Sequence, residues 1–225
     1  SPWTTGTLKE SKINQNELSQ PRQKSVAQSI AILLAAGESK RMGQLKALLP
    51  WQGRTMLEHQ VNSLIGGGLD KIIVVLGHGK EKLLPLLTDP EYVTPIYNPN
   101  YLSGKTSSIK CGLAQIHATN TDYVMLLNVD QPRSSDIIRI LAQYHETSRS
   151  LITIPSFNGK GGHPIIFDIS LLPDLLKIEE STQGIKSVVT ENQDRLQKVD
   201  VCYEEVLWDL NTPEEYNKMS AKFEA

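Results

Sequence analysis

The sequence has 225 residues, of which 39% are hydrophobic and 21% charged, a composition typical of one globular domain. Its 23 Lys and Arg residues almost balance its 25 Asp and Glu residues, so the formal net charge of -2 excludes a general attraction for nucleic acid or an anionic membrane. The apolar runs are much shorter than the ~20 residues of a membrane-spanning helix, and no signal-peptide core precedes them, which predicts a cytoplasmic protein.

The N-terminal part of the chain differs in pattern from the rest. Residues 1–28 are polar and lack the periodicity of a helix or strand, which predicts a weakly structured tail. Residues 29–225 alternate short apolar runs with amphipathic stretches, as βα units around a parallel sheet do. A strand is expected at 30–34, a helix at 55–64 and a second strand at 71–76, which together form a β-α-β unit.

The alternation continues to the end of the chain. Strands are expected at 123–127 and 151–154, with a helix at 134–147 between them. A further strand is expected at 199–206, and Thr212 is predicted to cap a final helix. The sequence shows no internal repeat and no second domain, so it predicts a single α/β domain, 29–225, with a mostly parallel sheet in a three-layer α/β/α sandwich.

A loop with phosphate-binding chemistry follows the first predicted strand. Residues 34–46 read Leu-Ala-Ala-Gly-Glu-Ser-Lys-Arg-Met-Gly-Gln-Leu-Lys. Gly37 lets successive N–H groups converge on phosphate oxygens, and Ser39 adds a hydroxyl donor. Arg41 and Lys46 offset the remaining charge of a triphosphate, at the sheet edge where open α/β proteins bind ligands. The alternative is a solvated turn without a ligand.

Two other phosphate motifs are absent. A Walker loop would need a glycine at Pro99, before Gly104-Lys105-Thr106. The dinucleotide fingerprint would need a third glycine at Lys82, after Gly77-His78-Gly79.

Residues 34–46 resemble the opening signature of the molybdenum cofactor nucleotidyltransferases, the family of the MobA-like NTP transferase domain, in which Leu-Ala-Ala/Gly-Gly-x-Ser-x-Arg-Met-Gly-x-x-Lys recurs. Every fixed position matches, and the resemblance extends through residue 216. It implies a Rossmann-like fold of the nucleotide-diphospho-sugar transferase type, with Arg41, Lys46 and Asp130 as catalytic residues. The nucleotide contacts that it implies are Leu34, Ala35, Ala36, Gly37, Ser39, Arg41, Lys46, Ser108 and Asp130.

A candidate metal ligand follows the strand expected at 123–127. The next residues, Asn-Val-Asp-Gln-Pro, present Asp130 at the carboxyl edge of the sheet beside the first loop. Mg²⁺ prefers oxygen ligands and often bridges one or two carboxylates to substrate phosphates. Alternatively, Asp130 only begins a turn with Pro132.

In the family, the Asp-x-Pro motif has this metal-binding role, and a late Asp-x-Asp/Asn segment supplies a second ligand, here from Asp209-Leu210-Asn211. Asn211 brings an amide oxygen but no negative charge, so the sequence leaves open whether Asp209 or Asn211 binds Mg²⁺. Asn211 could equally serve only to cap the last helix.

The acceptor side carries the largest departures from the family pattern. Gly162, His163 and Pro164 resemble its Gly-His-Pro turn, which implies a substrate role, although such a histidine is more often an ordinary loop residue. Lys105 stands where the family usually has Met. Residues 181–186 read Ser-Thr-Gln-Gly-Ile-Lys where cytidylyltransferases of this type usually read Gly-Asp-x-Gly-Ala-Arg, and Lys cannot form the bidentate fork of Arg. The acceptor could therefore differ.

The resemblance implies transfer of a nucleoside monophosphate, favoured as CMP from CTP, to the terminal phosphate of molybdopterin, with release of pyrophosphate. Ala36, where guanylyltransferases more typically have Gly, favours cytosine. The expected partners are a nucleoside triphosphate, molybdopterin or another small phosphorylated acceptor, and a molybdoenzyme as recipient, with no nucleic acid and no membrane. The alternatives are a guanylyltransferase of the same family, a sugar-1-phosphate nucleotidyltransferase, and a non-catalytic nucleotide-binding escort.

Overall fold

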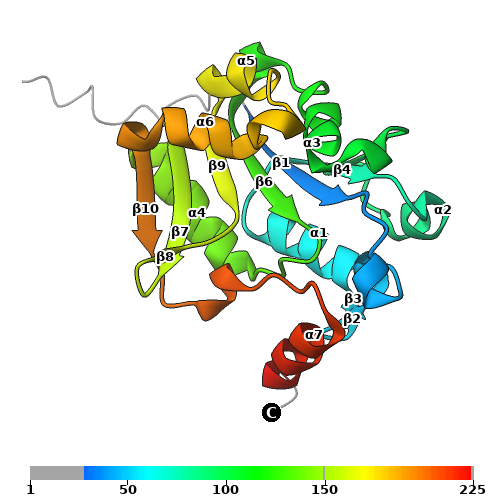
Figure 1. The fold of residues 1–225 in the computed structure, drawn as a ribbon. Helices are drawn as coiled ribbons and strands as arrows, with labels where there is room; N and C mark the ends of the chain where they lie inside the picture. The colour runs from blue at the N-terminus through cyan, green and yellow to red at the C-terminus, as the bar shows by residue number, and fades with distance from the viewer. Residues whose placement is uncertain (1–27, 149, 224–225) are drawn as a thin grey trace, which may run out of the picture.

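The computed structural model describes residues 28–148 and 150–223 (Figure 1). The tail predicted at 1–28 lies outside the described residues except for Gln28, with which the first strand begins. Within the described ranges, no helix is both long and apolar enough to cross a membrane.

The strands of the main sheet follow the order β10-β7-β9-β6-β1-β4-β5, and the short β8 pairs with β7. Its pairs are parallel except those made by β8 and β9. Its strands are β1 (Gln28–Ala35), β4 (Lys71–Leu76), β5 (Val93–Tyr97), β6 (Thr121–Asn128), β7 (Ile152–Phe157), β8 (Lys160–Gly161), β9 (Ile165–Asp168) and β10 (Leu196–Asp200). A separate hairpin joins β2 (Pro50–Trp51) and β3 (Arg54–Thr55).

Helices cover both faces of the sheet, as Figure 1 shows. The helices are α1 (Met56–Gly66), α2 (Lys80–Leu83), α3 (Lys105–Leu113), α4 (Ser135–Ser148), α5 (Leu172–Leu175), α6 (Ile185–Glu191) and α7 (Pro213–Ser220). Residues of α1 and α4 belong to one buried apolar cluster, and residues of α3, α5 and α6 to the other. The three-layer α/β/α sandwich with a mostly parallel sheet is therefore confirmed.

β1 shows why the core has two halves. Ala31 and Leu33 face one cluster, whereas Ile32 and Leu34 face the other, because successive side chains of a strand point to opposite faces. β1 pairs with β4 on one side and β6 on the other. Its carboxyl end is therefore a point where the strand order reverses, which is where open α/β sheets place their ligand sites.

The predicted helix starts are confirmed. Thr55 and Thr212 cap α1 and α7, and each forms a capping box with the glutamate at the third helical position. The strand predicted at 199–206 is wrong over most of its length, since β10 ends at Asp200 and residues 204–207 form a 3-10 helix. The reason is a missing neighbour: Asp200 pairs with Ser156, and β7 itself ends one residue later. Val201 and Val206 are buried without belonging to a strand.

Candidate functional site

The loop after β1 is folded tightly back on itself. Ser39 has a φ of +55°, in the left-handed region that few residues other than glycine adopt. Its Oγ accepts a hydrogen bond from the Lys46 N–H at 3.1 Å, which closes the loop. Space around Gly37 is open, since an added Cβ would meet nothing within 4 Å. The loop therefore presents backbone and hydroxyl groups to a cavity at the end of β1.

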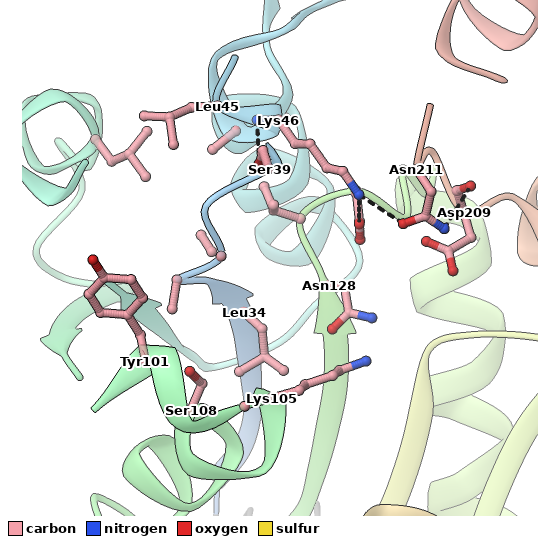
Figure 2. A pocket seen from close by; sticks show the side chains of 18 residues that line it. Leu34, Ser39, Leu45, Lys46, Tyr101, Lys105, Ser108, Asn128, Asp209 and Asn211 are labelled. Atoms are coloured by element: carbon pink, nitrogen blue, oxygen red, sulfur yellow. Dashed lines mark hydrogen bonds and ion pairs between the residues drawn. The ribbon is translucent and has the colours of Figure 1, made fainter. Parts of the chain in front are cut away.

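Lys46 brings two distant segments to this loop. Its Nζ donates to Asp130 Oδ2 at 2.6 Å and to Asn211 Oδ1 at 2.9 Å (Figure 2). Asp130 follows β6, and the N–H of Leu210 donates to the Asp130 carbonyl at 2.9 Å, which ties the late segment to the same place. The sheet order thus gathers residues that are far apart in sequence.

Asp209 points into the same cavity (Figure 2). Burial raises its pKa and the charge of Asp130 raises it further, while Asn211, Lys46 and Lys105 act in the opposite direction. A second positive charge near the two carboxylates would relieve this repulsion. Asn211 does not cap α7 with its side chain, because Thr212 holds that position.

The donors suit a magnesium ion that keeps waters and binds substrate phosphate. Asp130 and Asp209 supply carboxylate oxygens and Asn211 an amide oxygen, which are hard ligands. In the described ranges, no group of three or more His, Cys, Asp or Glu side chains could hold a metal ion. A metal here would therefore rely on few protein ligands, as Mg²⁺ commonly does.

The first cavity, of about 370 Å³, collects the predicted nucleotide contacts. All of them line it except Arg41, which lines a smaller adjoining cavity together with Lys46 and Asn211. Ser108 is held in place by Asn98, whose Nδ2 donates to the Ser108 Oγ at 3.0 Å. Arg41 is exposed, unlike the partly buried Lys46.

A second cavity, of about 720 Å³, opens beside the first and shares Leu34, Lys105, Asn128 and Asp209 with it. His163 lines it, whereas Gly162 and Pro164 do not. Burial, followed by the charges of Arg133 and Lys105, lowers the pKa of His163 to about 4, so the imidazole is neutral at pH 7.

Gly162 supports the second cavity from behind. A Cβ at Gly162 would lie 2.1 Å from the Val206 carbonyl oxygen, so only glycine allows the two chain segments to approach this closely. The segment 181–186, which departs most from the family pattern, supplies the opposite wall through Gln183, Gly184 and Lys186. The residues expected at the acceptor side are thus either in this cavity wall or directly behind it.

Comparison with known proteins identifies the family of the chain. Residues 31–197 match the model of the MobA-like NTP transferase domain. The chain belongs to this family. Molybdenum cofactor cytidylyltransferase of Escherichia coli is 28% identical over 186 residues, which cover 82% of this chain and 92% of that protein. Nicotine blue oxidoreductase of Paenarthrobacter nicotinovorans is 27% identical over 195 residues, which cover 84% of this chain and 94% of that protein.

Solved structures of similar fold include a nucleotidyl transferase from Methanothermobacter thermautotroptrophicus, with a TM-score of 0.73 and 23% identity over 87% of this chain and 97% of that one. Another is a Mycobacterium tuberculosis protein in complex with manganese, with a TM-score of 0.68 and 21% identity over 87% of this chain and 98% of that one. The predicted family and the nucleotide-diphospho-sugar transferase fold are confirmed, and membership places the chain among the nucleotidyltransferases.

A buried arginine that sequence reasoning missed joins the parts of this MobA-like site. Arg133 is 1% exposed, and its guanidinium donates to the carbonyls of Pro132, His163, Val206 and Trp208 at 2.7 to 3.1 Å. Burial lowers its pKa to about 9, with the charges of Glu205, Asp209 and Asp130 opposing, so it remains a cation at neutral pH. Arg133 therefore fixes the Asp130 loop, the His163 turn and the late segment relative to one another.

Gln60 of α1 is a second residue that sequence reasoning missed. Its Nε2 donates to the Asn128 and Gln131 carbonyls at 3.0 and 2.6 Å, and its Oε1 accepts the Arg133 N–H at 3.1 Å. Gln60 thus holds the loop that carries Asp130. The partners of Gln60 and Arg133 are backbone groups of distant segments, so no sequence motif indicates the roles of these two residues.

Proposed function

We propose that this protein is a magnesium-dependent nucleotidyltransferase that transfers a nucleoside monophosphate, CMP from CTP in the leading hypothesis, to the terminal phosphate of molybdopterin or another small phosphorylated acceptor. The observation that carries the proposal is the convergence of Lys46, Asp130 and Asp209 in the phosphate-loop cavity, which adjoins a second cavity that Asp209 also lines. A cavity that holds two acids and a cation and opens beside a second cavity is what the transfer of a phosphoryl-linked group between two substrates requires.

In the proposed reaction, an oxygen of the acceptor phosphate attacks the α-phosphorus of the triphosphate in line. A new P–O bond forms, the bond between the α-phosphorus and the β-phosphate oxygen breaks, and pyrophosphate leaves with the electron pair. No protein nucleophile and no proton transfer are needed when the acceptor phosphate is a dianion. The protein contributes position and charge, which dominate catalysis of such transfers.

The site residues have distinct parts in this proposal. Gly37 and Ser39 orient the phosphates, and Lys46 and Arg41 offset their charge. Asp130 and Asp209 would hold Mg²⁺, which supplies charge neutralisation at the transferring phosphorus. We favour Asp209 over Asn211 as the second ligand, because the Asp209 carboxylate brings a negative charge that the Asn211 amide lacks, and in the described ranges Asp209 has no ion pair.

The choice of CTP rests on Ala36 and on the E. coli relative. Ala36 is 4% exposed and lines the first cavity, where its methyl group takes room that a glycine would leave for guanine. A guanylyltransferase remains the first alternative, and a sugar-1-phosphate transferase or a non-catalytic escort would use the same phosphate loop. An oxidoreductase, as the P. nicotinovorans relative is named, is less favoured because Lys82 breaks the dinucleotide fingerprint.

Pyrophosphate release tests the proposal. The purified protein is incubated with Mg²⁺, anaerobic molybdenum-loaded molybdopterin, and CTP, GTP, ATP or UTP in separate reactions. Release selective for CTP is the expected result, and a molybdoenzyme would then be the recipient of the product. Selectivity for GTP would overturn the base assignment, and no release with any nucleotide or with sugar phosphates would overturn the transferase proposal in favour of an escort.

A further inference from the structure

One cation lines both cavities and has no assigned part in the reaction. Lys105, the first residue of α3, lines the first and the second cavity, and its side chain is exposed within them. In Figure 2 it extends from α3 past Asn128, on the opposite side of the site from Lys46. Among the described residues, the Lys105 ammonium makes no hydrogen bond and no ion pair.

The acids around Lys105 are partly engaged elsewhere. Asp130 is paired with Lys46. Glu180 accepts the Thr106 N–H at 3.1 Å, and a Cβ at Gly104 would lie 2.9 Å from the Glu180 carboxyl carbon. The chain's own carboxylate therefore already occupies the anion position at the start of α3. Asp209, the third acid whose charge acts on Lys105, is the proposed metal ligand, so the Lys105 ammonium stays available to a ligand at the junction of the cavities.

An acceptor phosphate bound in the second cavity would need a cation beside it. Of the described residues that line it, only Lys105 and Lys186 carry a positive charge, since His163 is neutral at pH 7. Lys186 lines the second cavity alone, whereas Lys105 also reaches the first. An attacking phosphate must lie at this boundary, next to the nucleotide's α-phosphorus.

We propose that Lys105 binds the phosphate monoester of the acceptor and thereby selects acceptors that present an anion at the junction of the two cavities. The proposal rests on the proposed function and names the residue that recognises the second substrate. The triphosphate lies on the other side of the site, where Lys46 and the glycine loop serve it. Lys105 is thus assigned to the acceptor rather than to the nucleotide.

Binding of a simple phosphate monoester tests this assignment without turnover. Phenyl phosphate is titrated by calorimetry into the full chain saturated with Mg²⁺ and α,β-methylene-CTP, which fills the nucleotide cavity and cannot transfer. Lys105→Met, similar in length but uncharged, is expected to weaken phenyl phosphate binding at least about tenfold, as loss of a charge-assisted hydrogen bond does. Lys105→Arg, which keeps the charge, is expected to stay within about threefold of the unaltered chain.

Lys110→Met is the matched control, because Lys110 lies on the same helix and lines neither cavity. It should leave phenyl phosphate binding unchanged. The proposal is overturned if phenyl phosphate does not bind the unaltered chain, if Lys105→Met binds it equally well, or if Lys110→Met weakens it as much. It is also overturned if Lys105→Met weakens the binding of α,β-methylene-CTP instead.

Steady-state kinetics separates this result from the proposed function. With active enzyme, Lys105→Met should raise KM for the acceptor at least about fivefold and leave KM for CTP within about twofold. Absence of pyrophosphate release with every nucleotide would sink the transferase proposal, while Lys105-dependent binding of phenyl phosphate would still establish the anion site. Pyrophosphate release with an acceptor KM that Lys105→Met leaves unchanged would support the transferase proposal and overturn the assignment of Lys105 to the acceptor.

Discussion

The two adjoining cavities are built in different ways. The cavity proposed for the nucleotide is built around one continuous stretch, residues 34–46, closed by the hydrogen bond between Ser39 and Lys46, and later segments complete its lining. The acceptor side is assembled from α3, the His163 turn and residues 180–190, which lie far apart in sequence. A local motif can therefore indicate part of the first cavity, whereas the second cavity depends entirely on how distant segments pack. If the second cavity binds the acceptor as proposed, its residues can vary without disturbing the phosphate loop.

Removing the Asp130 carboxylate from the first cavity should have the largest effect. Asp130→Ala is expected to lower turnover by about a thousandfold, because the charge that would hold the proposed metal and organise the transferring phosphate is lost. The thermal midpoint should change little, since Asp130 is partly exposed. Pyrophosphate release and thermal unfolding of the same preparation measure the two effects. Near-normal turnover in a folded Asp130→Ala protein would refute the metal role.

Substitution of Arg133 tests whether this residue holds the Asp130 loop, the His163 turn and the late segment together. Arg133→Met leaves four backbone carbonyls without their donor and is expected to lower the free energy of unfolding by about 3 kcal/mol or more. Urea unfolding measures this loss. Exposed Arg139→Met is the control and should cost less than about 0.5 kcal/mol. Equal stabilities of the two variants would contradict this role of Arg133.

The acceptor side should also respond to pH. The folded pKa of His163, about 4, lies below the ordinary value of about 6.5, so the unfolded chain binds the extra proton first as the pH falls. Its contribution to stability is present above pH 6.5 and is lost between about 6.5 and 4, by about 3 kcal/mol in total. Urea unfolding of the unaltered chain and of His163→Gln across this range measures the difference. If both lose stability in parallel, the imidazole does not titrate as stated.

The smallest effect is expected at the loop hydroxyl. Ser39→Ala removes the acceptor for the Lys46 N–H and a donor for the phosphates, so KM for the nucleotide should rise about three- to tenfold while KM for the acceptor stays near normal. Initial-rate kinetics with each substrate varied in turn gives both constants. A larger change on the acceptor side would mean that the two cavities are not separable in this way.

Periodicity and turn chemistry in the sequence by themselves determined the fold class and most of the elements. The strand at 71–76 has the predicted bounds, and Thr55 and Thr212 cap the predicted helices, because burial of alternate residues and capping are local properties. The glycine loop at 34–46 could be recognised from the sequence for the same reason. Its closing hydrogen bond, from the Lys46 N–H to Ser39, joins residues only seven positions apart.

Tertiary structure decided the rest. Residues 199–206 could not be placed from apolar pattern, because a strand also needs a neighbour and β7 ends before most of them. The parts of Arg133 and Gln60 were hidden, since their partners are backbone carbonyls of distant segments. The meeting of Lys46, Asp130 and Asn211, and the position of Lys105 between two cavities, follow from the order of strands in the sheet, which no single stretch of sequence contains.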